Sequence, residues 1–262
     1  MSIAYFLTLA FWPLDLFLEN SFFSFLQYTV PAALTYLSII NPVFSLVIPL
    51  IIPKLTLLPV LILFIFLTIN KINKKHFAFL VCIWTVIAIF KFSDFYGQTI
   101  FKSDYEAQQQ VVRNTQLYNN IFMARLMHNK ARIRLDAFNQ HLFELIDPGN
   151  YFFEFHPRLP DSSNQQLSKF PFIAIVPMLT GFLNIRKIKN YKTILGLIAA
   201  SLLSLSVLKI YDRHDFILYI PLALIIINGL NIIFKSQNIY TKMFKYIFAA
   251  VSLIELVRLI LI

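Results

Sequence analysis

Long apolar stretches separated by short polar loops make up most of this chain. After residue 54 the apolar stretches cover 55–70, 76–92, 171–185, 193–210, 216–234 and 244–262. A helix needs roughly 20 apolar residues to cross a hydrocarbon core of about 30 Å. In lipid the backbone must satisfy its hydrogen bonds within each helix. The pattern therefore predicts an all-α fold, a polytopic transmembrane helix bundle.

The first 53 residues follow this pattern less regularly. The stretch 3–18 contains Pro13 and Asp15, and 27–52 is long enough to cross but carries Pro31, Pro42 and Pro49. Prolines kink helices, although neighbouring helices can satisfy the freed carbonyls. Two further spans give about eight in total. If 3–18 is instead a re-entrant or interfacial helix, about seven remain.

Basic residues collect in three of the connecting loops. The loops hold ten basic residues and no acid, while the other 13 Lys/Arg balance the 13 Asp/Glu of the chain. Short loops rich in Lys and Arg stay on the cytoplasmic side of a membrane. We therefore expect a multi-pass protein with these loops inside: Lys71, Lys74 and Lys75; Arg186, Lys187, Lys189 and Lys192; Lys235, Lys242 and Lys245.

The same reasoning divides the chain into three parts. Residues 1–92 form N-terminal transmembrane helices, 93–170 an extracytoplasmic α-helical segment, and 171–262 four C-terminal transmembrane helices. In the middle part, Ser103 to Glu106 has the spacing of a capping box, which predicts a helix that runs to about residue 127. A second helix over 130–146 places Leu135, Phe138, Leu142 and Leu145 on one face.

Composition agrees with a membrane location. The chain is 58% hydrophobic and 14% charged, whereas a soluble domain is about 45–50% apolar and about 25% charged. A pI near 9.6 would suggest nucleic acid, but the basic residues follow membrane topology, so we expect no nucleic-acid partner. The expected partners are the bilayer and anionic lipid headgroups at the cytoplasmic loops.

Two external segments carry candidate chemistry. In an extended segment 151–158, Glu154 and His156 share one face and could do acid–base work, while Arg158 could bind phosphate. Asp94 lies on the same side and is a weaker candidate acid. The alternative for 151–158 is an aromatic anchor at the membrane interface.

The second segment is the short loop 211–215. Asp212, His214 and Asp215 are residue types that bind divalent cations, although no metal-ligand spacing signature is present. The simpler alternative is that a loop between spans is polar without binding a metal.

Polar residues also occur inside the apolar stretches. Glu255 and Arg258 are three residues apart, so they share a helix face and are predicted to form an intramembrane ion pair. Asn228 and Asn231 have the same spacing, and we expect them to hydrogen-bond between helices.

The run FELIDPGNYFFEFHPR at 143–158, followed by Phe170-Pro171-Phe172, carries a resemblance. It resembles a group of uncharacterised polytopic membrane proteins of small-genome bacteria. More faintly, it resembles the external loop region of membrane glycosyltransferases of the GT-C class, family 39 type. The first likeness implies the bacterial cytoplasmic membrane. The second implies a polyprenyl-linked sugar as substrate and an external acid as base, but the early external loop that carries this acid in the family is absent here.

These observations favour a non-enzymatic protein of the cell envelope. The leading interpretation is a scaffold or partner-binding protein with an external helical module, which contacts another envelope protein. The alternative is a GT-C-like transferase or an accessory subunit that acts on lipid-linked sugar. A transporter is third, because the chain shows no internal repeat of the kind common in transporters. The cofactor is unknown from the sequence. The chain has no Gly-rich phosphate loop, HExxH or CxxC motif.

Overall fold

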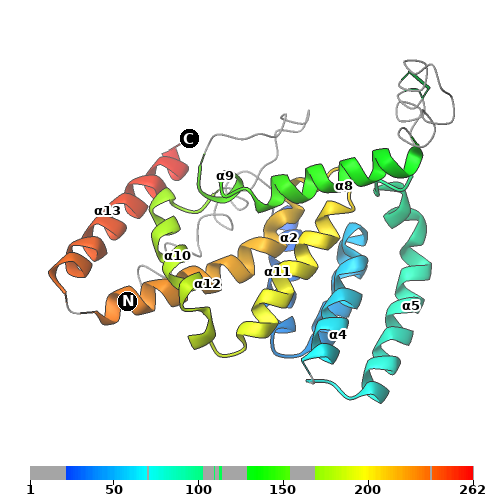
Figure 1. The fold of residues 1–262 in the computed structure, drawn as a ribbon, viewed down its shortest axis with the longest axis horizontal. Helices are drawn as coiled ribbons and strands as arrows, with labels where there is room; N and C mark the ends of the chain where they lie inside the picture. The colour runs from blue at the N-terminus through cyan, green and yellow to red at the C-terminus, as the bar shows by residue number, and fades with distance from the viewer. Residues whose placement is uncertain are drawn as a thin grey trace.

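The fold is all-α, as predicted. The computed structural model describes residues 22–69, 71–102, 109, 112–113, 129–153, 169–236 and 238–261. Within these residues every named element is a helix (Figure 1), and the β structure is limited to an isolated bridge between Thr99 and Leu208. The stretch 3–18 and the capping box at 103–106 lie outside the described residues.

Each of the six apolar stretches after residue 54 forms a helix. The elements are α2 (Phe22–Ser38), η1 (Pro42–Val47), α3 (Ile48–Ile51), η2 (Pro53–Leu55), α4 (Leu57–Thr68), α5 (Lys74–Gly97), α8 (Lys130–Ile146), α9 (Gly149–Phe152), η3 (Phe172–Ala174), α10 (Ile175–Leu183), η4 (Ile185–Lys187), α11 (Tyr191–Ser206), η5 (Asp212–Asp215), α12 (Phe216–Lys235) and α13 (Ile239–Leu261).

The structure divides the stretch 27–52, which we expected to cross the membrane once. Helix α2 ends at Ser38, and η1 and α3 pack back against it. Pro42 disfavours helical geometry in the residue before it, and Asn41 is extended with φ −139° and ψ 119°. The Asn41 side chain then accepts a hydrogen bond of 3.1 Å from the Val43 N–H and starts η1. This stretch is therefore a helix with a returning segment, not one crossing helix.

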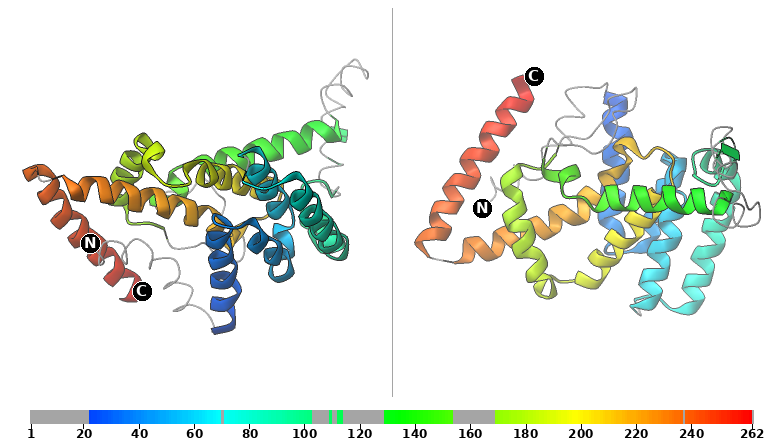
Figure 2. Two further views of the ribbon diagram at one scale, coloured as in Figure 1. Left: turned by 90° about the horizontal axis from the view of Figure 1, so that it is seen from below. Right: turned by 45° about the horizontal axis from the view of Figure 1, so that its top comes forward.

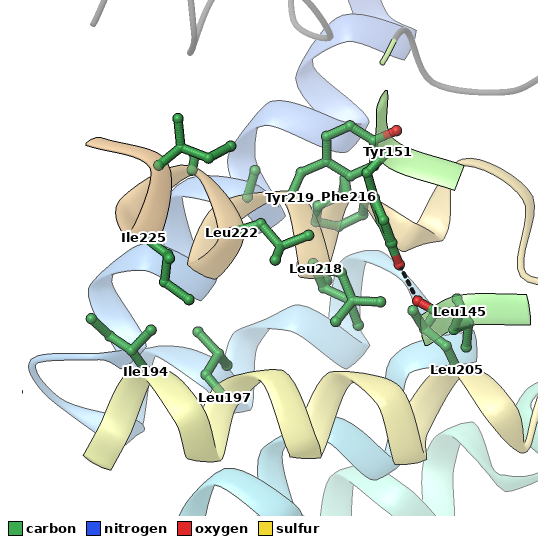
Figure 3. Packing of buried hydrophobic residues seen from close by; sticks show 14 of the residues in the cluster. Leu145, Tyr151, Ile194, Leu197, Leu205, Phe216, Leu218, Tyr219, Leu222 and Ile225 are labelled. Atoms are coloured by element: carbon green, nitrogen blue, oxygen red, sulfur yellow. Dashed lines mark hydrogen bonds between the residues drawn. The ribbon is translucent and has the colours of Figure 1, made fainter. Parts of the chain in front are cut away.

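Helix α12 is the centre of the core. It packs on α10, α11, α2 and α13, and Phe216, Ile225, Ile226 and Leu230 are fully buried along it. Figure 3 shows Tyr151 beside the first turns of α12, and Leu145 next to Leu205 of α11. A helix that is apolar on all sides is expected to be buried on several faces inside a bundle.

Two glycines allow α10 and α12 to approach closely. A Cβ on Gly229 would lie 1.8 Å from the Pro177 carbonyl oxygen, and one on Gly181 would lie 2.1 Å from the Ile225 carbonyl oxygen. Small residues at such a crossing let two backbones pack directly on each other, as is common between transmembrane helices.

Polar connections gather at two opposite sides of the helices. The α4–α5 and α10–α11 connections lie along the lower edge of Figure 1, and the C-terminal end of α12 lies toward the same side. Helix α8 lies along the upper edge, next to the ends of α5 and α11. At this upper side the Ile100 N–H donates to the Val207 carbonyl over 3.0 Å, and the Lys209 N–H donates to the Gln98 carbonyl over 2.9 Å.

Of the described helices, α5 and α12 are long and apolar enough to cross a membrane. Their surroundings differ. In the most apolar 18 residues of α12, 61% are buried inside the protein, whereas in those of α5 only 6% are buried. Figure 2 shows α13 at the periphery, where its main contacts are with α12 and η3.

The glycine crossing gives a test of the fold. We expect Gly229→Ala to lower the free energy of unfolding by about 1–3 kcal/mol, because the added methyl group forces α10 away from α12. The thermal unfolding of detergent-solubilised protein measures the effect. Gly97→Ala is the matched control, since a Cβ there meets nothing within 4 Å. An equal loss of stability in both variants would contradict the importance of the crossing.

Candidate functional site

Helix α8 brings polar side chains onto the upper end of the bundle. Asn129 caps the helix by accepting a hydrogen bond of 2.8 Å from the Arg132 N–H. Leu145 is buried on the inner face, which packs on α11. Leu135 was expected on this buried face, but it is 55% exposed. His141, one turn before Leu145, lies on the inner face instead of Leu135.

A polar cluster forms where α8 meets the α11–α12 connection. It consists of His141 and Glu144 from α8, and Tyr211 and His214 from the connection. The Tyr211 hydroxyl donates to Glu144 Oε2 over 2.9 Å, and Gln140 Nε2 donates to Glu144 Oε1 over 2.9 Å. Both oxygens of the Glu144 carboxylate are thus engaged, so this carboxylate ties α8 to the bundle.

His141 lies against the same tyrosine. The two rings meet edge to face, with centroids 5.7 Å apart and planes at 69°. Its Nδ1 is buried and has no hydrogen-bond partner among the described residues. A buried nitrogen without a hydrogen-bond partner is costly to stability.

His214 is held from two sides. Its Nδ1 lies 3.1 Å from the Tyr211 carbonyl oxygen, and its ring packs on Tyr28 of α2 with centroids 6.1 Å apart. Burial, and after it the positive charge of Lys54, lower the pKa of His214 to about 4, against the opposing effect of the hydrogen bond to Tyr211. His214 is therefore neutral at pH 7, and its packing on Tyr28 involves no charge.

The remaining chain around the cluster is also fixed. The Tyr151 hydroxyl donates to the Leu145 carbonyl over 2.7 Å (Figure 3). The ring of Tyr151 packs on that of Tyr219 with centroids 5.5 Å apart, and the Phe170 ring stacks on Tyr219 with centroids 5.0 Å apart. Aromatic contacts thus attach α9 to the first turns of α12, while Glu144 attaches α8 to the α11–α12 connection.

The sequence-predicted residues of the external segment fall in two groups. Glu154, His156 and Arg158 lie outside the described residues, so their proposed acid–base and phosphate-binding roles stay predictions. Asp94 lies in the last turn of α5, where its side chain is exposed.

The loop 211–215 is partly described. His214 is placed as above, Asp215 is 5% exposed directly before α12, and the side chain of Asp212 lies outside the described part. Among the described residues, no group of three or more His, Cys, Asp or Glu could hold a metal ion. The metal site with Asp212 as a ligand stays a prediction.

The polar residues of the last two helices lie away from the cluster. Glu255 is half-buried on α13, and the side chain of Arg258 is not among those described, so their ion pair stays a prediction. Asn228 lies on α12, and its Nδ2 is buried without a hydrogen-bond partner among the described residues.

No family model, curated protein or solved structure matches this chain. The resemblance to small-genome bacterial membrane proteins and to GT-C transferases therefore stays an expectation.

Sequence reasoning missed Glu144, His141 and Tyr211 as members of one cluster. The spacing of His141 and Glu144 was a usable signal, because residues three apart share a helix face. Their partner Tyr211 lies 67 residues beyond Glu144, and no local pattern marks that contact.

The pKa of His214 gives a test with a defined sign. Its folded-state pKa, about 4, lies below the ordinary value of 6.5. The unfolded chain therefore takes up a proton first as the pH falls, and stability is lost between pH 6.5 and pH 4. The contribution is about 3 kcal/mol, at 1.36 kcal/mol per pH unit. Thermal unfolding of the natural protein across this range measures it.

His214→Gln removes the titrating group and is the comparison variant. The difference in unfolding temperature between pH 7 and pH 4 should shrink in this variant. If the pH dependence is the same in both proteins, titratable groups other than His214 account for the whole loss of stability.

Proposed function

We propose that this chain is a multi-pass integral membrane protein of the bacterial cytoplasmic membrane, with its basic loops in the cytoplasm and α8 on the external side. The surface of α5 is the observation that carries this proposal. Large apolar side chains are exposed along the whole helix, with exposed fractions of 64% for Phe79, 54% for Val86, 70% for Ile89 and 82% for Phe90. Leu80 is the buried residue of its 24 positions.

In water this surface would be strongly unfavourable. Each square ångström of exposed apolar surface costs roughly 25 cal/mol relative to burial, and soluble monomers rarely expose large contiguous apolar patches. In lipid the same surface carries no such cost, because the tails are as apolar as the side chains. The basic connections at one side of the helices supply the orientation, since such loops stay in the cytoplasm.

On the external side, we infer a scaffold role for α8. The Glu144 carboxylate accepts hydrogen bonds at both oxygens, an arrangement suited to holding α8 in place rather than to removing a proton from a substrate. The outer side of the helix carries exposed Leu135, Phe143 and Ile146, which lie within about 80° of one another around an α-helix of 3.6 residues per turn.

The chemistry of this outer stripe favours a protein partner. Lys130 and Arg132 are exposed in the first turn of the same helix, and Arg132 pairs with Asp136 over 3.3 Å. An apolar patch with charged residues at its edge is typical of protein interfaces. A complementary partner has an apolar surface with carboxylates at its rim. The GT-C-like transferase remains an alternative that depends on Glu154, His156 and Arg158.

The native Cys82 and two introduced cysteines test the membrane topology. Cys82 is the single cysteine of the chain and lies on α5. We expect it to resist an impermeant maleimide in intact cells and to react after denaturation. In a Cys82→Ser background, Lys130→Cys should be labelled from outside and Lys189→Cys should be protected until the cells are opened.

The outcomes separate the two parts of the proposal. Labelling of Lys189→Cys with protection of Lys130→Cys would mean the opposite orientation. Ready labelling of Cys82 in intact cells and in sealed inverted vesicles alike would mean that α5 does not cross a membrane.

A charge on the outer stripe tests the scaffold role. We expect Phe143→Glu to leave the protein in the membrane but to abolish a larger complex on native gels, because a carboxylate is buried against the apolar partner surface. Tyr240→Glu is the matched control, since Phe143 is 72% and Tyr240 75% exposed, on different helices. Loss of the complex in both variants, or in neither, would contradict a docking role for α8.

A further inference from the structure

Two of the basic loops are joined into one surface by a single lysine. Lys71 Nζ donates to Asn190 Oδ1 over 3.0 Å and to Thr193 Oγ1 over 2.9 Å. Its ammonium also lies 5.6 Å from the centre of the Phe66 ring. These contacts connect residues that are 119 and 122 positions apart, so the α4–α5 and α10–α11 connections form one continuous surface, which we call the basic loop pair.

The basic loop pair carries positive charge that no carboxylate balances. The partners of Lys71 are a neutral amide and a neutral hydroxyl. The sequence ranges 69–76 and 184–193 contain no Asp or Glu. None of the loop-pair cations contacts a carboxylate within the described part of the chain, and all are exposed: Lys71, Lys74, Lys75, Arg186, Lys187, Lys189 and Lys192.

Exposed apolar side chains border these cations. Leu183, just before η4, is 87% exposed, and Leu179 one turn earlier is 55% exposed. On the other connection, Phe79 is 64% exposed one turn after Lys75. A ligand that fits has an anionic head at the level of the loops and apolar chains along the adjoining helices.

We infer that the basic loop pair is a selective site for the phosphate headgroup of an anionic phospholipid. This inference rests on the proposed function, because it requires α5 and α10 to face lipid. Several cations on two loops surround one headgroup, so their attractions add, at about 1 kcal/mol for each Lys or Arg near the surface. Free phosphate and nucleic acid lack the apolar chains that the bordering leucines and phenylalanine would contact.

Spin-labelled phosphatidylglycerol in phosphatidylcholine nanodiscs that contain the full-length protein tests the site. The association constant of the labelled lipid, relative to labelled phosphatidylcholine, is read from the motionally restricted fraction of its spectrum. We expect the natural protein to prefer phosphatidylglycerol. In the variant K71Q/K187Q/K189Q the ratio of the two association constants should fall at least tenfold, since each lysine contributes a factor of roughly five.

The control variant is K91Q/K102Q/K130Q, which removes the same charge from the other side of the helices and should keep the preference. Equal loss in both variants would overturn the inference, because it would make the effect one of net charge. So would displacement of the labelled lipid by inorganic phosphate, or by a single-stranded oligonucleotide, at concentrations that leave ionic strength unchanged.

The protection of Cys82 in the same nanodiscs separates this inference from the proposed function. Protected Cys82 without any preference for phosphatidylglycerol would overturn the lipid site alone. Reactive Cys82 would overturn the membrane crossing, and the lipid site with it.

Discussion

The close crossing of α10 and α12 is the constraint on which the rest of the structure depends. Helix α12 has neighbours on several faces, and Gly181 and Gly229 set its distance from α10. In its first turns, the Tyr219 ring packs against the rings of Tyr151 and Phe170. Its last turn receives Lys245, whose Nζ donates to the Phe234 carbonyl over 2.8 Å. Any side chain larger than hydrogen at the crossing would move all of these contacts together.

The two long apolar helices differ sharply in how much of their surface the protein covers. Helix α12 loses its apolar surface to protein neighbours, while α5 keeps its surface exposed. In water, the same hydrophobic effect that buries α12 would act on α5 with equal force. A lipid surrounding removes this inconsistency, because apolar side chains then need no protein cover.

The sequence predicted the helices, since these follow from local composition. It did not predict the return of the chain at 39–52, because apolar prolines such as Pro42 and Pro49 fit both a kinked crossing helix and a broken one. Nor did it predict the pairs Glu144–Tyr211 and Lys71–Asn190. These join distant segments, and the polar residues involved are individually ordinary for loops and helix ends.

Polar contacts near both ends of α5 and in its middle join this helix to the rest of the protein. In the proposed lipid surrounding the hydrophobic effect would not draw helices together, so close packing and hydrogen bonds would have to hold them. Helix α5 is accordingly located by hydrogen bonds along its length: Lys71 to α11 just before its start, Trp84 Nε1 to the Thr56 carbonyl over 2.8 Å, and Gln98 to Lys209 just after its end.

Thr193 near the start of α11 makes one of these contacts, and Lys209 just beyond its C-terminal end makes another. Tyr211, two residues after Lys209, also donates a hydrogen bond to Glu144 of α8. Polar groups at and just beyond the ends of α11 thus contact both α5 and α8. Since α11 also packs on α12, a displacement at the glycine crossing would reach both sides of the protein through this one helix.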